Sequence, residues 1–427
     1  MPNIGVVGAG VGGLHLSLLL QQRGVPVTLY ADRGPEELRQ QPRLVNTAGH
    51  WEGTRRRERE LGIAHWDDDV QPIVRMKVDV GGPRPMRFEA GFDVGPAAID
   101  YRIMMPRLLE DFVARGGEVV RGAVTREQLE DLALRHDLVV VSSGRGSMTE
   151  LFPKDEARSP FARPQRLIQI SVVDGTDVGD GSVNYELVPG VGELLTFPYL
   201  TDEGVFQIMY VSAAVDGPLP PLMNADLAGS ASREGLERVF RDVVGGWFPA
   251  SDARVDWDRF RTLGPRYDIA GAITPTVRRP YARLDNGRWV LAIGDVHTVN
   301  DPVLGQGANA ASASAFIVGD AIAEDPFGFD ELWCQRVATR IWERSGAAVN
   351  FTNAILAVPP RPQVVQLLAA ASVSPPVAET VARCFGRPRL AWSILDSEAR
   401  TREAIAQIGG PETLRAVDAA LADAAAA

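Results

Sequence analysis

The sequence predicts an α/β fold with three parts: a parallel sheet covered by helices, an inserted β-rich region, and a helical C-terminal region. The first observation is a βαβ unit that opens the chain, with elements expected at 4–8, 12–23 and 25–30. The second is the richness in β-forming residues at 70–97 and 166–213. The third is a helical pattern from about residue 320 onward, with one break at 357–362.

Later segments are expected to return to the first sheet, so that the domain containing it is discontinuous. The pattern predicts a helix at 101–117, an extended segment at 118–122, a buried strand at 136–144 and a further strand at 289–294. We expect the parallel domain to comprise 1–42, 98–160 and 281–323, the β-sheet domain 43–97 and 161–280, and the helical region 324–427.

Composition restricts the class of protein. The 427 residues are 45% hydrophobic and 23% charged, which is ordinary for a soluble globular chain. The net charge of −11 argues against nucleic acid or an anionic membrane as a partner. No stretch is typical of a transmembrane helix, and the apolar start of the chain lacks the basic residues of a signal peptide.

Cysteine and histidine usage gives no sign of a metal site or a disulfide framework. The two cysteines, Cys334 and Cys384, have no metal-like spacing, and the five histidines are scattered along the chain. We therefore expect no bound metal and a reducing, cytoplasmic location.

The stretch GAGVGG follows the first strand and opens the first helix. In this pattern Gly8 permits the tight turn, Gly10 lets the backbone approach a diphosphate, and Gly13 lets the helix lie close to the strand. Asp32 ends the second strand about 20 residues later and is expected to bind ribose hydroxyls of the cofactor, with Arg33 beside it. The alternative for Asp32 is a solvated charge in a loop.

The stretch GDVHTVNDPVLGQGANAAS, residues 294–312, passes from an apolar strand through a loop into an Ala/Ser-rich helix. A glycine-rich helix start exposes backbone N–H groups to an electron-rich ligand. Together with the first motif it predicts the second half of an FAD site, and an NAD-binding dehydrogenase with a chance glycine-rich loop is the alternative. The cofactor-binding residues expected here are Asp295, Pro302, Gly305, Gln306, Gly307 and Asn309.

Five of these residues have a specific expected contact with the flavin. Asp295 would accept hydrogen bonds from ribityl hydroxyls, and Pro302 would hold the loop over the ring. Backbone N–H groups at Gly305, Gln306 and Gly307 would lie beside the pyrimidine side of the isoalloxazine. There they would stabilise the anionic reduced ring.

The two motifs together resemble the flavoprotein aromatic hydroxylase superfamily, whose FAD domain is Rossmann-like. Single-component members of that superfamily carry an Asp-Gly pair after the strand that corresponds to HDLVVV. Here the residues are Ser142-Ser143-Gly144-Arg145-Gly146, and the Asp is missing. The departure argues against a protein that reduces its own flavin with NADH or NADPH.

A closer resemblance covers nearly the whole chain. The stretches RLVNTAGH (43–50), GGPRPMRF (81–88), DYR (100–102), NDPVLGQGAN (300–309) and NFT (350–352) resemble the styrene monooxygenase family. That family comprises the oxygenase components of two-component flavin epoxidases and has indole monooxygenases as close relatives. The resemblance implies an FAD domain, a β-sheet substrate domain and a C-terminal helical region.

The resemblance also implies the reaction and its partners. FAD is used in its reduced form, supplied by a separate NADH-dependent flavin reductase. With O₂ as co-substrate it forms a C4a-hydroperoxide, which oxygenates a small aromatic alkene, indole or sulfide. The protein then has to orient the substrate and exclude water, so no catalytic triad or carboxylate dyad is expected. A homodimer is one oligomeric state that the sequence leaves open.

Four residues are expected close to the cofactor. Arg43 would neutralise an FAD phosphate, with a surface arginine as the alternative. Arg102 would approach FAD from a helix start, with a surface salt bridge as the alternative. Asn46 would hydrogen-bond the flavin or order a water beside it, unless it only caps a turn. Asn46 and His50 are the candidate catalytic residues. The alternative role for His50 is to hold the backbone in place.

The substrate cavity is expected to be apolar. Asn46 also belongs to its expected lining. Val303 and Leu304 would form a wall beside the ring, and Phe197 and Met209 would face the cavity from β-like segments, with core packing as the alternative.

Three other functions are alternatives to the two-component oxygenase. A self-sufficient NAD(P)H-dependent aromatic hydroxylase is disfavoured by the missing Asp-Gly pair. A flavin-dependent halogenase should contain a WxWxIP segment and a catalytic lysine, but the segment is absent and the chain has two lysines. A non-catalytic FAD-binding module is disfavoured because the motifs at both ends of the flavin are intact.

Overall fold

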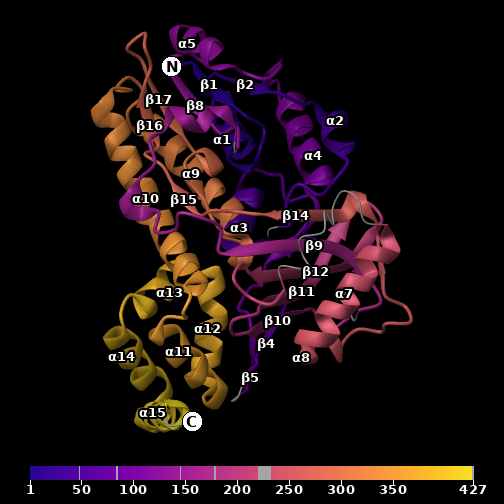
Figure 1. Ribbon diagram of the computed structural model, residues 1–427. Helices are drawn as coiled ribbons and strands as arrows, with labels where there is room; N and C mark the ends of the chain where they lie inside the picture. The colour runs from indigo at the N-terminus through magenta and orange to yellow at the C-terminus, as the bar shows by residue number, and fades with distance from the viewer. Residues whose placement is uncertain (48, 83–84, 145, 177–178, 220–231, 426–427) are drawn as a thin grey trace.

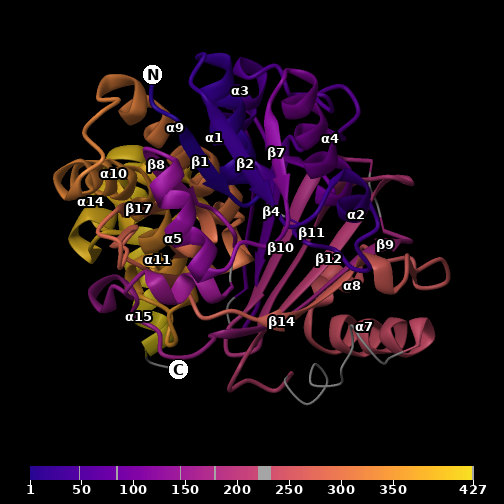
Figure 2. The same ribbon diagram turned by 90° about the horizontal axis from the view of Figure 1, so that it is seen from above.

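The computed structural model describes residues 1–47, 49–82, 85–144, 146–176, 179–219 and 232–425. Figure 1 shows three regions: a sheet with helices around the N-terminus, a second sheet beside it, and a group of helices that contains the C-terminus. In the view from above, the strands of the second sheet run beneath the first region (Figure 2).

The first sheet has six strands in the order β16-β17-β8-β1-β2-β7. β16 pairs antiparallel with β17, and the other neighbours pair in parallel. Buried runs such as IGVV form such strands because helices cover both faces of the sheet. Its strands are β1 (Ile4–Val7), β2 (Val27–Ala31), β7 (Glu118–Arg121), β8 (Leu138–Val141), β16 (Tyr281–Arg283) and β17 (Trp289–Ala292).

Alternate residues of β8 divide the two faces of this sheet. Leu138 and Val140 join the core that contains α1 (Val11–Gln22), α4 (Tyr101–Ala114) and α9 (Gln306–Glu324). Val139 and Val141 join the core that contains α5 (Arg126–Arg135). The N-termini of α1 and α9 therefore lie on the same side of the sheet, next to the carboxyl ends of β1 and β17.

The second sheet has eight strands, in the order β13-β9-β12-β11-β10-β4-β5, with β14 also paired to β9. α7 (Arg233–Trp247) and α8 (Pro249–Asp252) follow β12 in the chain, and α7 covers one face of the sheet. The strands are β4 (Arg75–Val80), β5 (Met86–Gly91), β9 (Arg166–Asp174), β10 (Ser182–Val188), β11 (Gly192–Thr201), β12 (Gly204–Ala214), β13 (Arg261–Thr262) and β14 (Asp268–Ala272).

The C-terminal region is helical, and α11 and α12 pack against β5 (Figure 1). The break expected at 357–362 separates α10 from α11, where Pro362 begins the new helix. The helices are α10 (Glu331–Leu356), α11 (Pro362–Val373), α12 (Pro375–Gly386), α13 (Pro388–Leu395), α14 (Glu398–Gly409) and α15 (Pro411–Ala425).

Short elements connect these regions. They are α2 (Pro35–Arg39), α3 (Glu52–Glu60), β3 (Gly49–His50), β6 (Ala97–Ala98), β15 (Thr276–Val277) and β18 (Thr298–Val299). α3 differs from expectation, because the sequence assigned 43–97 to the β-sheet domain and α3 packs against α9 instead. The reason is that the buried side chains of Arg57 and Glu58 have partners on α9, α1 and β3.

Two further expectations concern membranes and cysteines. None of the described helices is long and apolar enough to cross a membrane. Cys334 and Cys384 are free and buried, and burial raises the pKa of each thiol to about 12. Both thiols therefore stay protonated near neutral pH.

Candidate active site

The loop between β17 and α9 is shaped by one acid and one glycine. The side chain of Asp301 accepts a hydrogen bond from the N–H of Val303 at 3.0 Å and so begins a short 3-10 turn over Pro302–Leu304. Gly305 then adopts a left-handed conformation with φ of 60°, which suits glycine. This residue is the N-cap of α9, and among the described residues no side chain caps the helix. The first amides of α9 are therefore available to a ligand.

A cavity of about 450 Å³ lies against this loop, and we name it the flavin cavity after the cofactor that the sequence motifs predict there. Its lining joins the loop to the second sheet and to the segment around Asn46. From the loop and α9 come Asp295, Pro302, Val303, Leu304, Gly305 and Gly307, and from the sheet come Ile168, Ile170, Leu195, Phe197 and Tyr210. Backbone amides and one carboxylate thus meet an apolar wall.

The first glycine motif has the geometry of a diphosphate cradle. Gly8 has a φ of 110°, and a Cβ on Gly13 would lie only 1.9 Å from the carbonyl oxygen of Gly8, so both positions require glycine. A Cβ on Gly10 would have no described atom within 4 Å. The same open space surrounds Gly307 at the start of α9. The residues present therefore fit a dinucleotide whose two ends approach α1 and α9.

Several predicted cofactor residues lie at the surface, and one has a side chain that forms hydrogen bonds with protein groups. Asp32 and Arg33 follow β2 and are exposed, with an ion pair of 3.1 Å between them. Arg43 is also exposed, and its charge acts on buried Asp268. The Gln306 side chain is buried, and its amide nitrogen donates to the carbonyls of Leu304 and Phe385, so this nitrogen is used by the protein.

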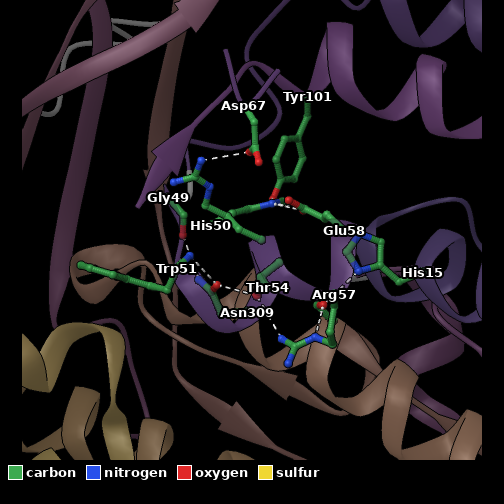
Figure 3. Close-up of polar contacts among 12 residues, drawn as sticks. His15, Gly49, His50, Trp51, Thr54, Arg57, Glu58, Asp67, Tyr101 and Asn309 are labelled. Carbon is green, nitrogen blue, oxygen red and sulfur yellow. Dashed lines mark hydrogen bonds and ion pairs between the residues drawn. The ribbon is translucent and has the colours of Figure 1, made fainter. Parts of the chain in front are cut away.

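Asn309 was expected to bind the cofactor, and this prediction is wrong for its side chain. The amide nitrogen donates to the carbonyls of Gly49 and Gly305, at 2.9 and 2.8 Å. The amide oxygen accepts from the N–H of Trp51 at 3.0 Å and from the hydroxyl of Thr54 at 2.7 Å (Figure 3). Two accepted and two donated bonds use the full capacity of an amide. Asn309 therefore ties segment 49–54 to α9.

Arg102 was also expected to approach FAD, and the structure places it elsewhere. Its guanidinium forms a buried ion pair with Asp100, with the closest atoms 2.5 Å apart and both side chains 1% exposed. Its remaining Nη1 donates to the carbonyl of Arg266, and the group stacks 4.6 Å from the ring centroid of Tyr267. Arg102 therefore holds the start of α4 against the second sheet.

Met209 was expected to face the substrate cavity, and the structure places it in a core on the other face of the second sheet. β11 and β12 pair antiparallel, with Phe197 opposite Ile208 and Thr196 opposite Met209. Phe197 lines the flavin cavity, whereas Met209 is fully buried on the other face, in the core that contains Phe240 of α7. Successive strand residues point to opposite faces, so an error of one position reverses the side chain.

His50 is fully occupied by protein groups. Its Nδ1 lies 2.5 Å from a carboxylate oxygen of Glu58, and its Nε2 lies 2.7 Å from the hydroxyl of Tyr101 (Figure 3). The neighbouring residues Gly49 and Trp51 line the flavin cavity, but His50 does not. The structure therefore contradicts a direct catalytic contact and supports the alternative role, in which His50 holds the backbone in place.

His50 belongs to a buried polar cluster that sequence reasoning missed. Its members are His15, His50, Arg57, Glu58, Tyr101 and Ser312. His15 lies 2.9 Å from the hydroxyl of Ser312 and 3.8 Å from Glu58. One signal was visible: a histidine in the apolar run GGLHLSLLL of α1 needs a buried partner.

Burial sets the protonation states in this cluster. It lowers the pKa of His15 to about 4 and raises the pKa of Tyr101 well above its usual value. Burial alone would raise the pKa of Glu58, but the charge and hydrogen bond of His50 lower it overall. Because Glu58 is ionised and can only accept, His50 donates to it through Nδ1.

Asp301 is a further buried acid that the sequence did not single out. It is 0% exposed, and burial raises its pKa to about 7. Its second carboxylate oxygen has no hydrogen-bond partner among the described residues. The acid therefore lies neutral beneath the loop at slightly acidic pH.

Asn46 lies at the edge of the flavin cavity, where its backbone carbonyl accepts a hydrogen bond from the Tyr199 hydroxyl at 2.9 Å. Four positions of the sequence motifs, Ala48, Pro83, Arg84 and Arg145, lie outside the described residues. In the part of the chain that the structure describes, no group of His, Cys, Asp and Glu is placed to hold a metal ion.

Known proteins share this sequence and architecture. The family model "Styrene monooxygenase A putative substrate binding domain" matches residues 144–254. Styrene monooxygenase StyA of Pseudomonas sp is 33% identical over 407 residues, which cover 93% of this chain and 96% of that protein. The StyA protein of Pseudomonas fluorescens is 32% identical with the same coverage.

Solved structures with lower identity share the fold. A flavoprotein/dehydrogenase from Cytophaga hutchinsonii is 12% identical, with a TM-score of 0.66 and coverage of 95% of this chain and 98% of that one. The tetrameric form of 2-methyl-3-hydroxypyridine-5-carboxylic acid oxygenase is 15% identical, with a TM-score of 0.59 and coverage of 90% and 97%. These likenesses confirm the predicted α/β fold with an inserted β-sheet and C-terminal helices. With 33% identity to StyA over almost its full length, the chain belongs to the styrene monooxygenase A family of flavin monooxygenases.

Proposed function

We propose that this chain is the oxygenase component of a two-component system, which uses reduced FAD and O₂ to oxygenate a small apolar aromatic alkene, indole or sulfide. The observation that supports this most is the flavin cavity, where the uncapped start of α9 meets an apolar wall built by the second sheet. A polar cofactor edge and an apolar substrate require these two kinds of lining side by side.

The chain's own residues have separate tasks in this proposal. Gly8, Gly10 and Gly13 would hold the diphosphate of FAD, and Asp295 would hold the ribityl chain. The first amides of α9 would lie beside the reduced ring and favour its negative charge. Bound reduced FAD supplies the activation of O₂.

The substrate would be oriented by shape and apolar contact. Leu195 and Phe197 from the sheet and Val303 and Leu304 from the loop line the cavity, and they would exclude water from the space beside the ring. Asn46 would place its amide at the edge of the same space. Styrene is the first compound to test, because two relatives with about a third of their residues identical carry its name.

A separate NADH-dependent flavin reductase would supply the reduced FAD, by diffusion or by transient contact. Family membership supports this partner, and so does the sequence Ser142-Ser143-Gly144 where self-sufficient hydroxylases carry Asp-Gly. The self-sufficient hydroxylase remains the second candidate.

Product analysis separates these two candidates. The purified chain is supplied with FAD, NADH, an unrelated flavin reductase and ¹⁸O₂, and styrene, indole and thioanisole are offered in turn. We expect one labelled oxygen in the product, and no NADH consumption when the reductase is omitted. Rapid reduction of bound FAD by NADH or NADPH alone would favour the self-sufficient hydroxylase, and no product from any compound would contradict an oxygenase of this substrate class.

Two residues on neighbouring strands give a matched test of the substrate wall. Phe197→Ala enlarges the flavin cavity, so we expect a changed preference between styrene and larger alkenes. Met209→Ala removes a buried side chain on the opposite face and is expected to cost roughly 2–5 kcal/mol of stability without changing that preference. Relative product yields from mixed substrates and urea unfolding measure the two effects. An unchanged preference in Phe197→Ala would remove this residue from the substrate wall.

A further inference from the structure

A second cavity, of about 300 Å³, lies between the second sheet and the C-terminal helices. We name it the outer cavity. The sheet contributes apolar side chains from β4, β5 and β10, and α10 and α11 contribute others from the opposite side. Representative lining residues are Val80, Met86, Leu187, Phe351, Ile355 and Leu368.

The outer cavity and the flavin cavity share a wall. Met76, Tyr185, Leu304 and Phe385 line both cavities. Leu304 belongs to the loop that begins α9, and Phe385 belongs to α12. These four side chains therefore form the barrier between the two spaces.

The far end of the outer cavity reaches the surface. Its lining there includes the exposed ion pair between Arg163 and Asp216, with a closest distance of 2.7 Å, and Val358, which is 66% exposed. A small molecule thus has a path from solvent into the outer cavity and, across the shared wall, toward the flavin cavity.

The charged residues in the described lining of the outer cavity pair with each other and leave no unpaired charge for a charged ligand. Arg166 and Glu193 both contribute to its lining, but they form a buried ion pair with a closest distance of 2.8 Å. Arg166 makes two further contacts with Glu193 through Nε, and its Nη1 donates to the carbonyl of Gln165. Because the pair satisfies itself, the remaining surface selects an apolar molecule.

We propose that the outer cavity is a second binding site for the aromatic substrate, which then passes the shared wall to reach the flavin cavity. The volume is sufficient, since a dry apolar cavity of about 150 Å³ holds one benzene molecule. The identity of the ligand as substrate rests on the proposed function. Occupation of the site by an apolar aromatic molecule follows from the cavity itself.

Stoichiometry of indole binding tests the site without turnover. Calorimetric titration of the wild-type chain with indole is expected to show two sites. Leu368→Trp fills the outer cavity from α11 and should leave one site, and Ile269→Trp fills the flavin cavity and should leave the other. Val373→Trp is the matched control, because Val373 lies on the same helix, is 58% exposed and should leave both sites.

Kinetics with styrene and an added reductase give the second readout. Leu368→Trp should raise the KM for styrene about tenfold with little change in kcat, because the cofactor side is untouched. If Leu368→Trp does not fold, Ile355→Phe fills the same cavity and replaces it in both experiments. Two indole sites in a folded filling variant, or an unchanged KM, would overturn the second site. Failure of the wild-type chain to oxygenate any aromatic compound would instead overturn the proposed function, while the indole titration would still report on the cavity.

Discussion

The flavin cavity and the buried polar cluster are separated by one step along an extended segment. Gly49 and Trp51 line the cavity, and His50 between them points into the cluster. The cavity combines backbone amides with apolar side chains, and Asp295 is the carboxylate among its described lining residues. The cluster holds two histidines, a glutamate and a tyrosine in direct contact, and Ser312 links Arg57 to His15 (Figure 3).

This difference assigns separate tasks to the two regions. Titratable side chains near the site stabilise the scaffold that presents the cavity, and the cavity itself provides shape, amide donors and protection from water. Such a division suits a reaction whose difficult step belongs to a cofactor. It also suits the positions of Asn309, which ties segment 49–54 to α9, and of Arg102, which holds the start of α4, although both lie within family motifs.

The largest expected effect is on Arg102. Arg102→Leu leaves the Asp100 carboxylate buried without its partner. We expect this to cost roughly 3–5 kcal/mol of stability. The double variant Asp100→Asn, Arg102→Leu removes the stranded charge and should recover most of that loss. Urea unfolding measures both. The folded single variant should bind FAD with wild-type affinity, and a large loss of FAD affinity without loss of stability would restore Arg102 to the cofactor site.

The second effect concerns Asp301 and pH. Its pKa is 3.8 in an ordinary setting and about 7 when buried here. Between these values the folded chain holds a proton that the unfolded chain has lost, so stability falls as the pH rises through this window and levels off above it. Asp301→Asn keeps the acceptor for Val303 and has no proton to lose. Relative to wild type, the variant should therefore gain roughly 3 kcal/mol of stability as the pH rises from 5 to 8.

Other groups also contribute to the pH dependence of stability. Their contributions cancel when the variant is compared with wild type. Burial lowers the pKa of His15 to about 4 and that of His297 to about 3, so both contribute a loss of stability as the pH falls below their ordinary value of 6.5. This contribution is the same in both chains. A pH-independent difference between Asp301→Asn and wild type in urea unfolding would show that Asp301 is ionised in the fold throughout.

The smallest effect concerns the glycine motif. Gly10→Ala adds a methyl group to open space in an ordinary backbone conformation, with φ of −83°, so the fold should be unaffected. The methyl group lies where the diphosphate would approach, and we expect FAD to bind about tenfold more weakly, which corresponds to about 1.4 kcal/mol. Gly246→Ala is the control, since its added Cβ also meets no described atom and it lies in α7. Equal FAD affinity in both variants would place the diphosphate elsewhere.

Sequence reasoning succeeded where a local pattern carries the information. The βαβ unit, the return of β17 to the first sheet and the glycine-rich start of α9 depend on short-range periodicity and on glycine conformations. Val303 and Leu304 adjoin the same motif and line the flavin cavity, and their role as a wall beside the flavin stays a prediction.

Sequence reasoning failed where a residue's position depends on contacts between distant segments, or on which face of a strand its side chain occupies. Phe197 and Met209 look equally suitable in sequence, and only the register of β11 with β12 sends them to opposite faces. The His15 side chain contacts Ser312, which lies 297 residues later in the chain. Such partners depend on how the first sheet, α3 and α9 come together, which no local pattern records.

The central claim is that oxygen transfer needs no single protein acid or base, and His50 gives its most direct test. Enzyme loaded with reduced FAD and styrene is mixed with oxygenated buffer for one turnover, and both FAD reoxidation and styrene oxide are followed in wild type, His50→Gln and Asn46→Ala. We predict that both variants form product, with rates lower by at most one to two powers of ten, since losing one hydrogen bond costs roughly 1–3 kcal/mol. Normal reoxidation of FAD with no styrene oxide in either variant would contradict the claim and make that residue a catalytic acid or base.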